Sequence, residues 1–171
     1  VTPTSGGCAG STFTITVPVR SRPAANNSTT ASVCSGAAFS FNPQTNITNG
    51  MASTFTWTAA YPAGLTGGAA NGTGNVAGTL NNVTGGTLNA VFTVTPTSGG
   101  CAGATFTITV PVRSLPVGGN SSQAAVCSGT AFSFNPQSNI TNGMASTFAW
   151  TAAYPAGLTG GAANGTGNVA G

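Results

Sequence analysis

Large apolar and small polar residues alternate along several short segments of the chain. Residues 12–17 read TFTITV and residues 54–58 read TFTWT, with Phe, Ile, Val or Trp at every second position. The segments 38–41 and 88–94 follow nearly the same pattern. Such alternation predicts β-strands that bury one face and expose threonine on the other. Because no segment combines helical periodicity with capping residues, we expect an all-β protein.

The chain repeats itself with a period of 93 residues. Residues 1–78 align without a gap on residues 94–171, and 11 of the 78 positions differ. Seven of these differences fall between Arg22 and Ser32. A fixed period of this kind is typical of an array of structural units. Six or seven short strands in each unit, separated by Asn-Gly, Gly-Gly and Tyr-Pro turns, predict tandem immunoglobulin-like or PKD-like β-sandwich repeats.

The period also predicts the domain organisation. We expect residues 1–21 to be the C-terminal part of a preceding repeat, 22–114 one complete β-sandwich, and 115–171 the N-terminal part of a following repeat. The sequence is then a window from a longer protein. The variable stretch 21–28, with its counterpart 114–119, is expected to be a linker, since linkers tolerate change better than packed strands.

The composition excludes most kinds of chemistry. The chain has no Asp, Glu, His or Lys, and its only charged side chains are Arg20, Arg22 and Arg113. General acid–base catalysis needs a group that titrates near the working pH, and calcium or magnesium sites need carboxylates. Three arginines cannot form the basic stripe of a nucleic-acid-binding protein. We therefore expect no enzyme activity, no metal, no cofactor and no nucleic-acid partner.

Disorder and a membrane span are equally unsupported by the sequence. Hydrophobic residues make up 40% of the chain, with nine Phe, whereas disordered chains are poor in aromatic residues and rich in charge. No apolar run approaches the roughly 20 residues that cross a membrane as a helix. We expect a folded chain without a membrane span.

The cysteines allow more than one pairing. The complete repeat contains Cys34 and Cys101. With four strands between them, both cysteines would lie at the same end of the sandwich; with five strands, they would lie at opposite ends. We count four strands, at about 38–42, 53–60, 76–83 and 88–95, and predict a Cys34–Cys101 disulfide, while a fifth strand near 65–70 stays open. The alternatives are a Cys8–Cys34 disulfide between repeats and free buried thiols.

Three segments carry a resemblance to a known family. They are VCSG at 33–36, TFTWT at 54–58 and FTVTPTSGGCAGATFTITV at 92–110. Together they resemble the PKD-like, immunoglobulin-like repeats of Bacteroidetes surface and gliding adhesins. The resemblance implies β-sandwiches strung in large secreted proteins, exported by the type IX route and acting as extracellular stalks or adhesins.

A surface with so little charge tends to associate. The array is therefore expected either to pack against copies of itself, end to end and laterally, or to carry covalent glycans. Asn-x-Ser/Thr triplets, which are acceptors for N-linked sugar, begin at Asn27, Asn46, Asn71, Asn82, Asn120, Asn139 and Asn164.

Two classes of function remain. The first is a structural repeat of an extracellular filament or surface stalk, and the second is an adhesin or carbohydrate-binding module. Trp57 and Tyr61 could stack on a sugar, but Trp57 falls on the apolar side of its strand. The glycine-rich loop 67–74 contains no aromatic residue. These features and the near-identity of the copies favour the structural class.

Overall fold

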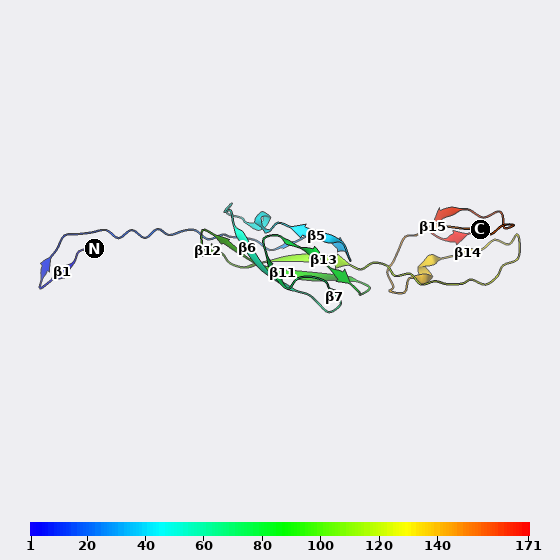
Figure 1. Ribbon diagram of the computed structural model, residues 1–171, viewed down its shortest axis with the longest axis horizontal. Coiled ribbons are helices and arrows are strands. Elements are labelled where there is room, and N and C mark those ends of the chain that lie inside the picture. The colour runs from blue at the N-terminus through cyan, green and yellow to red at the C-terminus, as the bar shows by residue number, and fades with distance from the viewer.

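The computed structural model describes all 171 residues, and Figure 1 shows an elongated arrangement. The N-terminal segment forms a small hairpin of β1 (Thr4–Ser5) and β2 (Cys8–Ala9). A long segment without regular secondary structure connects the hairpin to a central β-sandwich. A third, looser body of short strands follows at the C-terminal end.

The larger layer of the sandwich is a seven-stranded sheet built around two long strands. These are β11 (Thr87–Ser98) and β13 (Phe106–Arg113), which pair antiparallel from Thr87 opposite Arg113 to Val94 opposite Phe106. On its other side, β11 pairs antiparallel with β6 (Thr54–Ala60). The shorter strands of the sheet are β3 (Ser28–Thr29), β4 (Val33–Cys34), β8 (Asn71–Thr73) and β12 (Cys101–Ala102).

The smaller layer consists of two antiparallel pairs of short strands. β5 (Ala38–Phe41) pairs with β9 (Val76–Thr79), and β7 (Leu65–Thr66) pairs with β10 (Asn81–Asn82). The chain is thus almost entirely β, with two layers that face each other across a hydrophobic core, which confirms the prediction of an all-β immunoglobulin-like or PKD-like sandwich.

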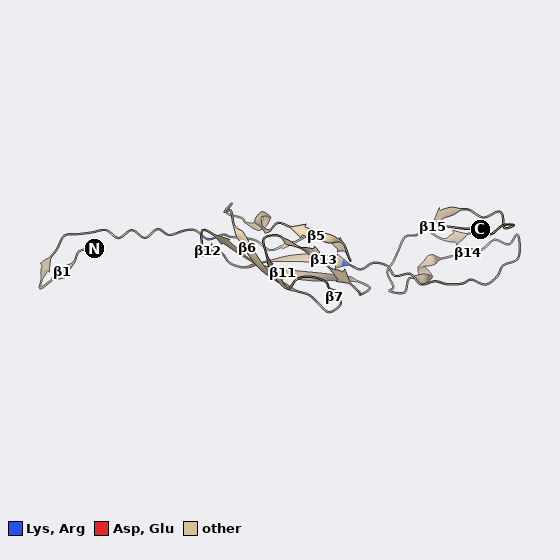
Figure 2. Cartoon of the chain, viewed as in Figure 1, with Lys and Arg blue, Asp and Glu red and all other residues tan.

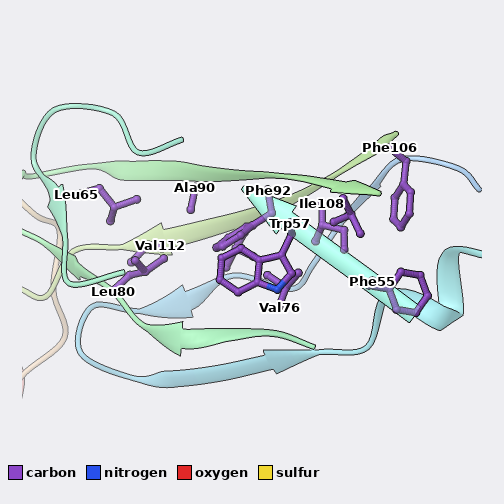
Figure 3. Packing of buried hydrophobic residues seen from close by; sticks show 12 residues of the cluster. Phe55, Trp57, Leu65, Val76, Leu80, Ala90, Phe92, Phe106, Ile108 and Val112 are labelled. Atoms are coloured by element: carbon purple, nitrogen blue, oxygen red, sulfur yellow. The ribbon is translucent and has the colours of Figure 1, made fainter. Parts of the chain in front are cut away.

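The core lies between the two layers and is centred on Phe92 (Figure 3). The rings of Trp57, Phe39 and Tyr61 meet the ring of Phe92 edge-on, at centroid distances of 5.4, 6.0 and 6.1 Å. β13 contributes every second side chain to this core, as the alternating sequence predicted. The buried hydrophobic residues are Phe55, Trp57, Leu65, Val76, Leu80, Ala90, Phe92, Val94, Phe106, Ile108, Val110 and Val112.

The C-terminal body repeats local elements of the sandwich. The 3₁₀ helix η1 (Pro43–Asn46) has a counterpart in η2 (Pro136–Asn139), and each follows an Asn whose Oδ1 accepts the N–H of a Gln at 3.0 Å. Two strand pairs accompany η2, formed by β14 (Ser133–Phe134) with β17 (Val169–Ala170) and by β15 (Ala149–Thr151) with β16 (Asn164–Thr166). Several large apolar side chains of this body are exposed, among them Val126, Phe132 and Leu158.

The segment 21–28 is not the linker that its composition suggested. Pro23 is buried, Ala25 forms an isolated bridge with the sandwich, and the Oδ1 of Asn27 accepts the N–H of Thr107 at 2.8 Å. Ser28 already belongs to β3. The prediction was wrong because asparagine side chains dock this strand-poor segment onto the sheet, an interaction that hydrophobic periodicity does not reveal.

Candidate functional site

The outer face of the larger sheet is lined by threonine. Thr93 of β11 lies directly between Thr58 of β6 and Thr107 of β13, and Thr56 lies between Thr95 and β8. Residues that are directly opposite in neighbouring strands share one face of a sheet. The threonine face comprises Thr54, Thr56, Thr58, Thr73, Thr93, Thr95, Thr97, Thr107 and Thr109.

The threonine face offers hydroxyl and methyl groups and no charge. Its strands lie about 4.8 Å apart, and successive threonines on one strand lie about 6.8 Å apart. Hydroxyls of this kind can hydrogen-bond or carry O-linked sugar, but nothing beside them can accept or release a proton near neutral pH. A shallow depression crosses the face where Thr56, Thr58, Thr93 and Thr95 meet β8. The face is therefore an uncharged surface of hydroxyl and methyl groups.

The two aromatic residues considered for sugar stacking belong to the fold. Trp57 is only 7% exposed, and its Nε1 donates to the carbonyl of Asn75 at 3.3 Å. Tyr61 packs on Phe92, and its hydroxyl donates to the carbonyl of Ala69 at 2.7 Å. Partial burial raises the pKa of the Tyr61 hydroxyl. Trp57 is therefore a core residue, as its strand position predicted, and its ring offers no free face to a sugar.

The structure separates the candidate sugar acceptors into two groups. Asn82 is buried, and its Nδ2 donates to the carbonyls of Val112 at 2.7 Å and Gly86 at 2.8 Å. Asn46 is also buried, and its Nδ2 donates to the carbonyl of Asn26 at 2.6 Å. N-linked sugar attaches at Nδ2, so a glycan on either residue would break these hydrogen bonds in the folded unit. The sequence predicted Asn46 and Asn82 as possible sugar acceptors, but in the fold both side chains have a structural role.

The remaining acceptors leave room for a sugar. Asn27, Asn71, Asn120 and Asn164 are exposed. Asn139 is half-buried, with its Nδ2 bonded to the hydroxyl of Ser121 at 2.9 Å in the C-terminal body.

The triplet at Asn82 was misread because the same three residues form a turn. The Oδ1 of Asn82 accepts the N–H of Thr84 at 3.0 Å and its hydroxyl at 2.7 Å. Asparagine side chains commonly close such turns. The strong turn signal of Gly85 and Gly86 immediately afterwards could have identified this role.

The predicted Cys34–Cys101 disulfide is wrong for this fold. No disulfide links any two of the four cysteines within this chain. Cys34 lies opposite Arg113 at one end of β13, whereas Cys101 follows β11 at its other end, where it pairs with Ser98. Because β11 spans 12 residues, at about 3.4 Å each, the two cysteines are separated by nearly the length of the sandwich. A disulfide requires Cα atoms within about 7 Å.

The cause is a fifth strand, β8, which lies at Asn71–Thr73, just after the stretch near 65–70 where the sequence left a fifth strand open. Between Cys34 and Cys101 the chain passes along the sandwich five times, in β5, β6, β8, β9 and β11. An odd number of passes leaves the two cysteines at opposite ends. The alternative Cys8–Cys34 pair fares no better, because Cys8 lies in the N-terminal hairpin, remote from the Arg113 end (Figure 1).

Arginines mark both ends of the central sandwich, and Figure 2 shows no other charge along the chain. The Nη1 of Arg20 donates to the carbonyl of Gly99 at 3.0 Å, in the turn between β11 and β12. Arg113 ends β13 and is exposed. Arg20 therefore bonds a backbone carbonyl of the central sandwich from the segment that precedes it.

A family model described as the PKD-like domain matches residues 31–116, which span most of the central sandwich. No curated protein and no solved structure matches the chain. No helix in the structure has the length and apolar character needed to cross a membrane.

Proposed function

The chain belongs to the PKD-like domain family, and on this basis we propose that it is a structural repeat of a secreted extracellular filament or surface stalk. Domains of this family are typically extracellular immunoglobulin-like modules with structural or adhesive roles, and they are generally not catalytic. The resemblance of residues 92–110 to Bacteroidetes surface repeats supports placing the array outside the cell of such an organism, after type IX export.

The observation that carries the proposal is the position of the two ends of the central sandwich. The chain enters beside β12, where Pro23 touches Gly103, and it leaves at Arg113, at the far end of β13. Entry and exit at opposite ends let successive units continue in one direction. Each added unit then extends the molecule instead of folding back on it.

The junction between units supports a stiff array. Ser114 bonds to the central sandwich through its hydroxyl, which donates to the carbonyl of Gly86 at 2.7 Å. The carbonyl of the next residue, Leu115, accepts the Nδ2 of Asn142 in the C-terminal body at 2.8 Å. Ser114 and Leu115 are adjacent in the chain but bond to different units. The junction therefore contains few residues that are free to bend.

The surface suits assembly or a coat. It has almost no charge, its threonine face is broad, and it exposes the acceptors Asn27, Asn71, Asn120 and Asn164. We propose that copies of the array contact one another through uncharged faces, or that sugars on these residues keep the copies apart. The intact mass of the native protein distinguishes a coated array from a bare one.

The test of the stalk is the length of arrays with two, four and six units, measured by small-angle scattering and electron microscopy. We expect the long dimension to grow by about 40 Å per unit, since 12-residue β11 runs along the axis. A length that fails to grow in proportion to the number of units would overturn the proposal.

A further inference from the structure

We propose that successive units of the array are joined by a disulfide between Cys34 of one unit and the Cys101 position of the following unit. This bond would run beside the peptide link at Arg113–Ser114. It differs from a disulfide within one unit and from the Cys8–Cys34 pair. The inference rests on the proposed tandem array.

Cys34 lies at the end where the chain leaves the unit. It is exposed and sits in register with Arg113, and the neighbouring Ser35 donates its N–H to the Arg113 carbonyl at 2.7 Å. Arg113 is the last residue of β13. The Cys34 thiol is therefore positioned at the face that the next unit approaches.

Cys101 lies at the end where the chain enters the unit. It forms the turn with Ser98 whose Gly99 carbonyl accepts the Nη1 of Arg20 at 3.0 Å. Two residues further on, Gly103 packs so closely on the Pro23 carbonyl that a side chain would not fit. The Cys101 turn is thus held against Arg20, at the end of the extended segment that precedes the unit.

The repeat connects these two observations. Residues 12–20 and 105–113 have the same sequence, so Arg20 and Arg113 occupy equivalent positions. The Cys101 turn accepts a hydrogen bond from Arg20 at the carbonyl of Gly99. In the array, the equivalent turn of the following unit would accept the same hydrogen bond from Arg113. Since Cys34 is the neighbour of Arg113, both thiols arrive at one junction.

The junction itself is packed closely enough to hold them there. Gly85 of the central unit approaches the carbonyl of Asn142 in the next body so closely that a Cβ would lie 2.6 Å from that oxygen. Ser114 and Leu115 are bonded to opposite sides of the junction. A disulfide would require the Cα atoms of the two cysteines to come within about 7 Å at this junction.

Formation of the bond balances with an external disulfide as the oxidant. The two thiols lose two protons and two electrons, an S–S bond forms between the units, and the oxidant is reduced to two thiols by exchange. In a long array each unit would use one cysteine at each end, leaving unpaired thiols only in the terminal units. A cut at Arg113–Ser114 would then leave the array joined.

The test uses three copies of residues 22–114 in tandem, because this unit carries a closed core of its own. Trypsin can cut each unit after Arg113, while the bond between Arg22 and Pro23 resists it. The protein is equilibrated in a buffer of reduced and oxidised glutathione. Free thiols are then blocked, and the chain is unfolded and digested. We expect the three units to stay linked on a non-reducing gel, to separate on reduction, and to contain two blocked thiols.

Single units released without reduction would overturn the proposal, whether their cysteines are free or paired within the unit. Cys34→Ser in the first unit should release that unit alone, and Cys34→Ser in the last unit should release none. Scattering from the undigested sample reports the length of the array separately. An extended array that falls apart after digestion would reject the disulfide and leave the stalk proposal intact.

Discussion

Gly72 lies directly opposite Trp57 in the pairing of β8 with β6, and the indole ring covers the space that a side chain at residue 72 would need. A Cβ built on Gly72 would overlap the ring atoms of Trp57. The same relationship recurs between Gly165 and Trp150 in the C-terminal body. The glycine of β8 is thus part of the packing of the largest core side chain.

Gly72→Ala should destabilise the central unit by about 1–3 kcal/mol, because the added methyl overpacks a rigid ring in the core. The measurement is denaturant unfolding of the wild type and the variant, followed by far-UV circular dichroism. The matched control is Gly78→Ala in β9, where the new Cβ would lie at an ordinary 3.9 Å from Phe39. The control should be neutral or slightly stabilising, and equal losses in both variants would contradict the role of the ring.

Asn82→Ala should cost about 1–3 kcal/mol, since it leaves the buried Val112 carbonyl without its donor and removes the turn to Thr84. Asn71→Ala, on the exposed strand β8, should change the unfolding free energy by no more than about 0.5 kcal/mol. Both residues begin an Asn-x-Thr triplet, so the pair separates the structural role from the sugar-acceptor role. Equal shifts of the unfolding midpoint in the two variants would show that the hydrogen bonds of Asn82 do not stabilise the fold.

The stability of the unit should hardly vary between pH 4 and pH 8, because no side chain in the sequence has a reference pKa in that range. At alkaline pH the partly buried Tyr61 changes this behaviour. Its folded-state pKa is raised, so its contribution is present below about pH 10 and is lost as the pH rises through the folded pKa.

Thermal unfolding across the pH range tests both statements. Tyr61→Phe should reduce the alkaline loss of stability. A sharp loss of stability in acid would contradict the first statement, because no side chain of the sequence is expected to titrate there. An alkaline loss that Tyr61→Phe does not alter would assign that loss to another group.

The alternation of residue types predicted the fold class and the core, because each long strand buries one face along its whole length. β13 places Phe106, Ile108, Val110 and Val112 inward without interruption. The same rule placed Trp57 in the core. These features are local, so a single sequence reveals them.

The strand that decided the disulfide prediction carries no such signal. β8 consists of Asn71, Gly72 and Thr73, which read as a loop because a glycine must lie beneath Trp57. The segment 21–28, which packs on the sheet just ahead of β3, also has no hydrophobic pattern. Asparagine side chains hold it in place, and large apolar side chains do not. Contacts made by small and polar residues between distant strands have no period, and the sequence therefore did not show them.

Residues 15 and 108 supply a matched test of how much burial in the sandwich contributes to stability. Both are isoleucine within identical nine-residue segments, but Ile108 is fully buried in β13, whereas Ile15 is 68% exposed in the extended N-terminal segment. Ile108→Ala should destabilise the central unit by about 2–5 kcal/mol through the lost burial and the cavity left behind. Ile15→Ala should have almost no effect on the same unfolding curve. A comparable loss in the Ile15 variant would mean that residues 12–20 pack against a sandwich in solution, because only a buried side chain can contribute that much.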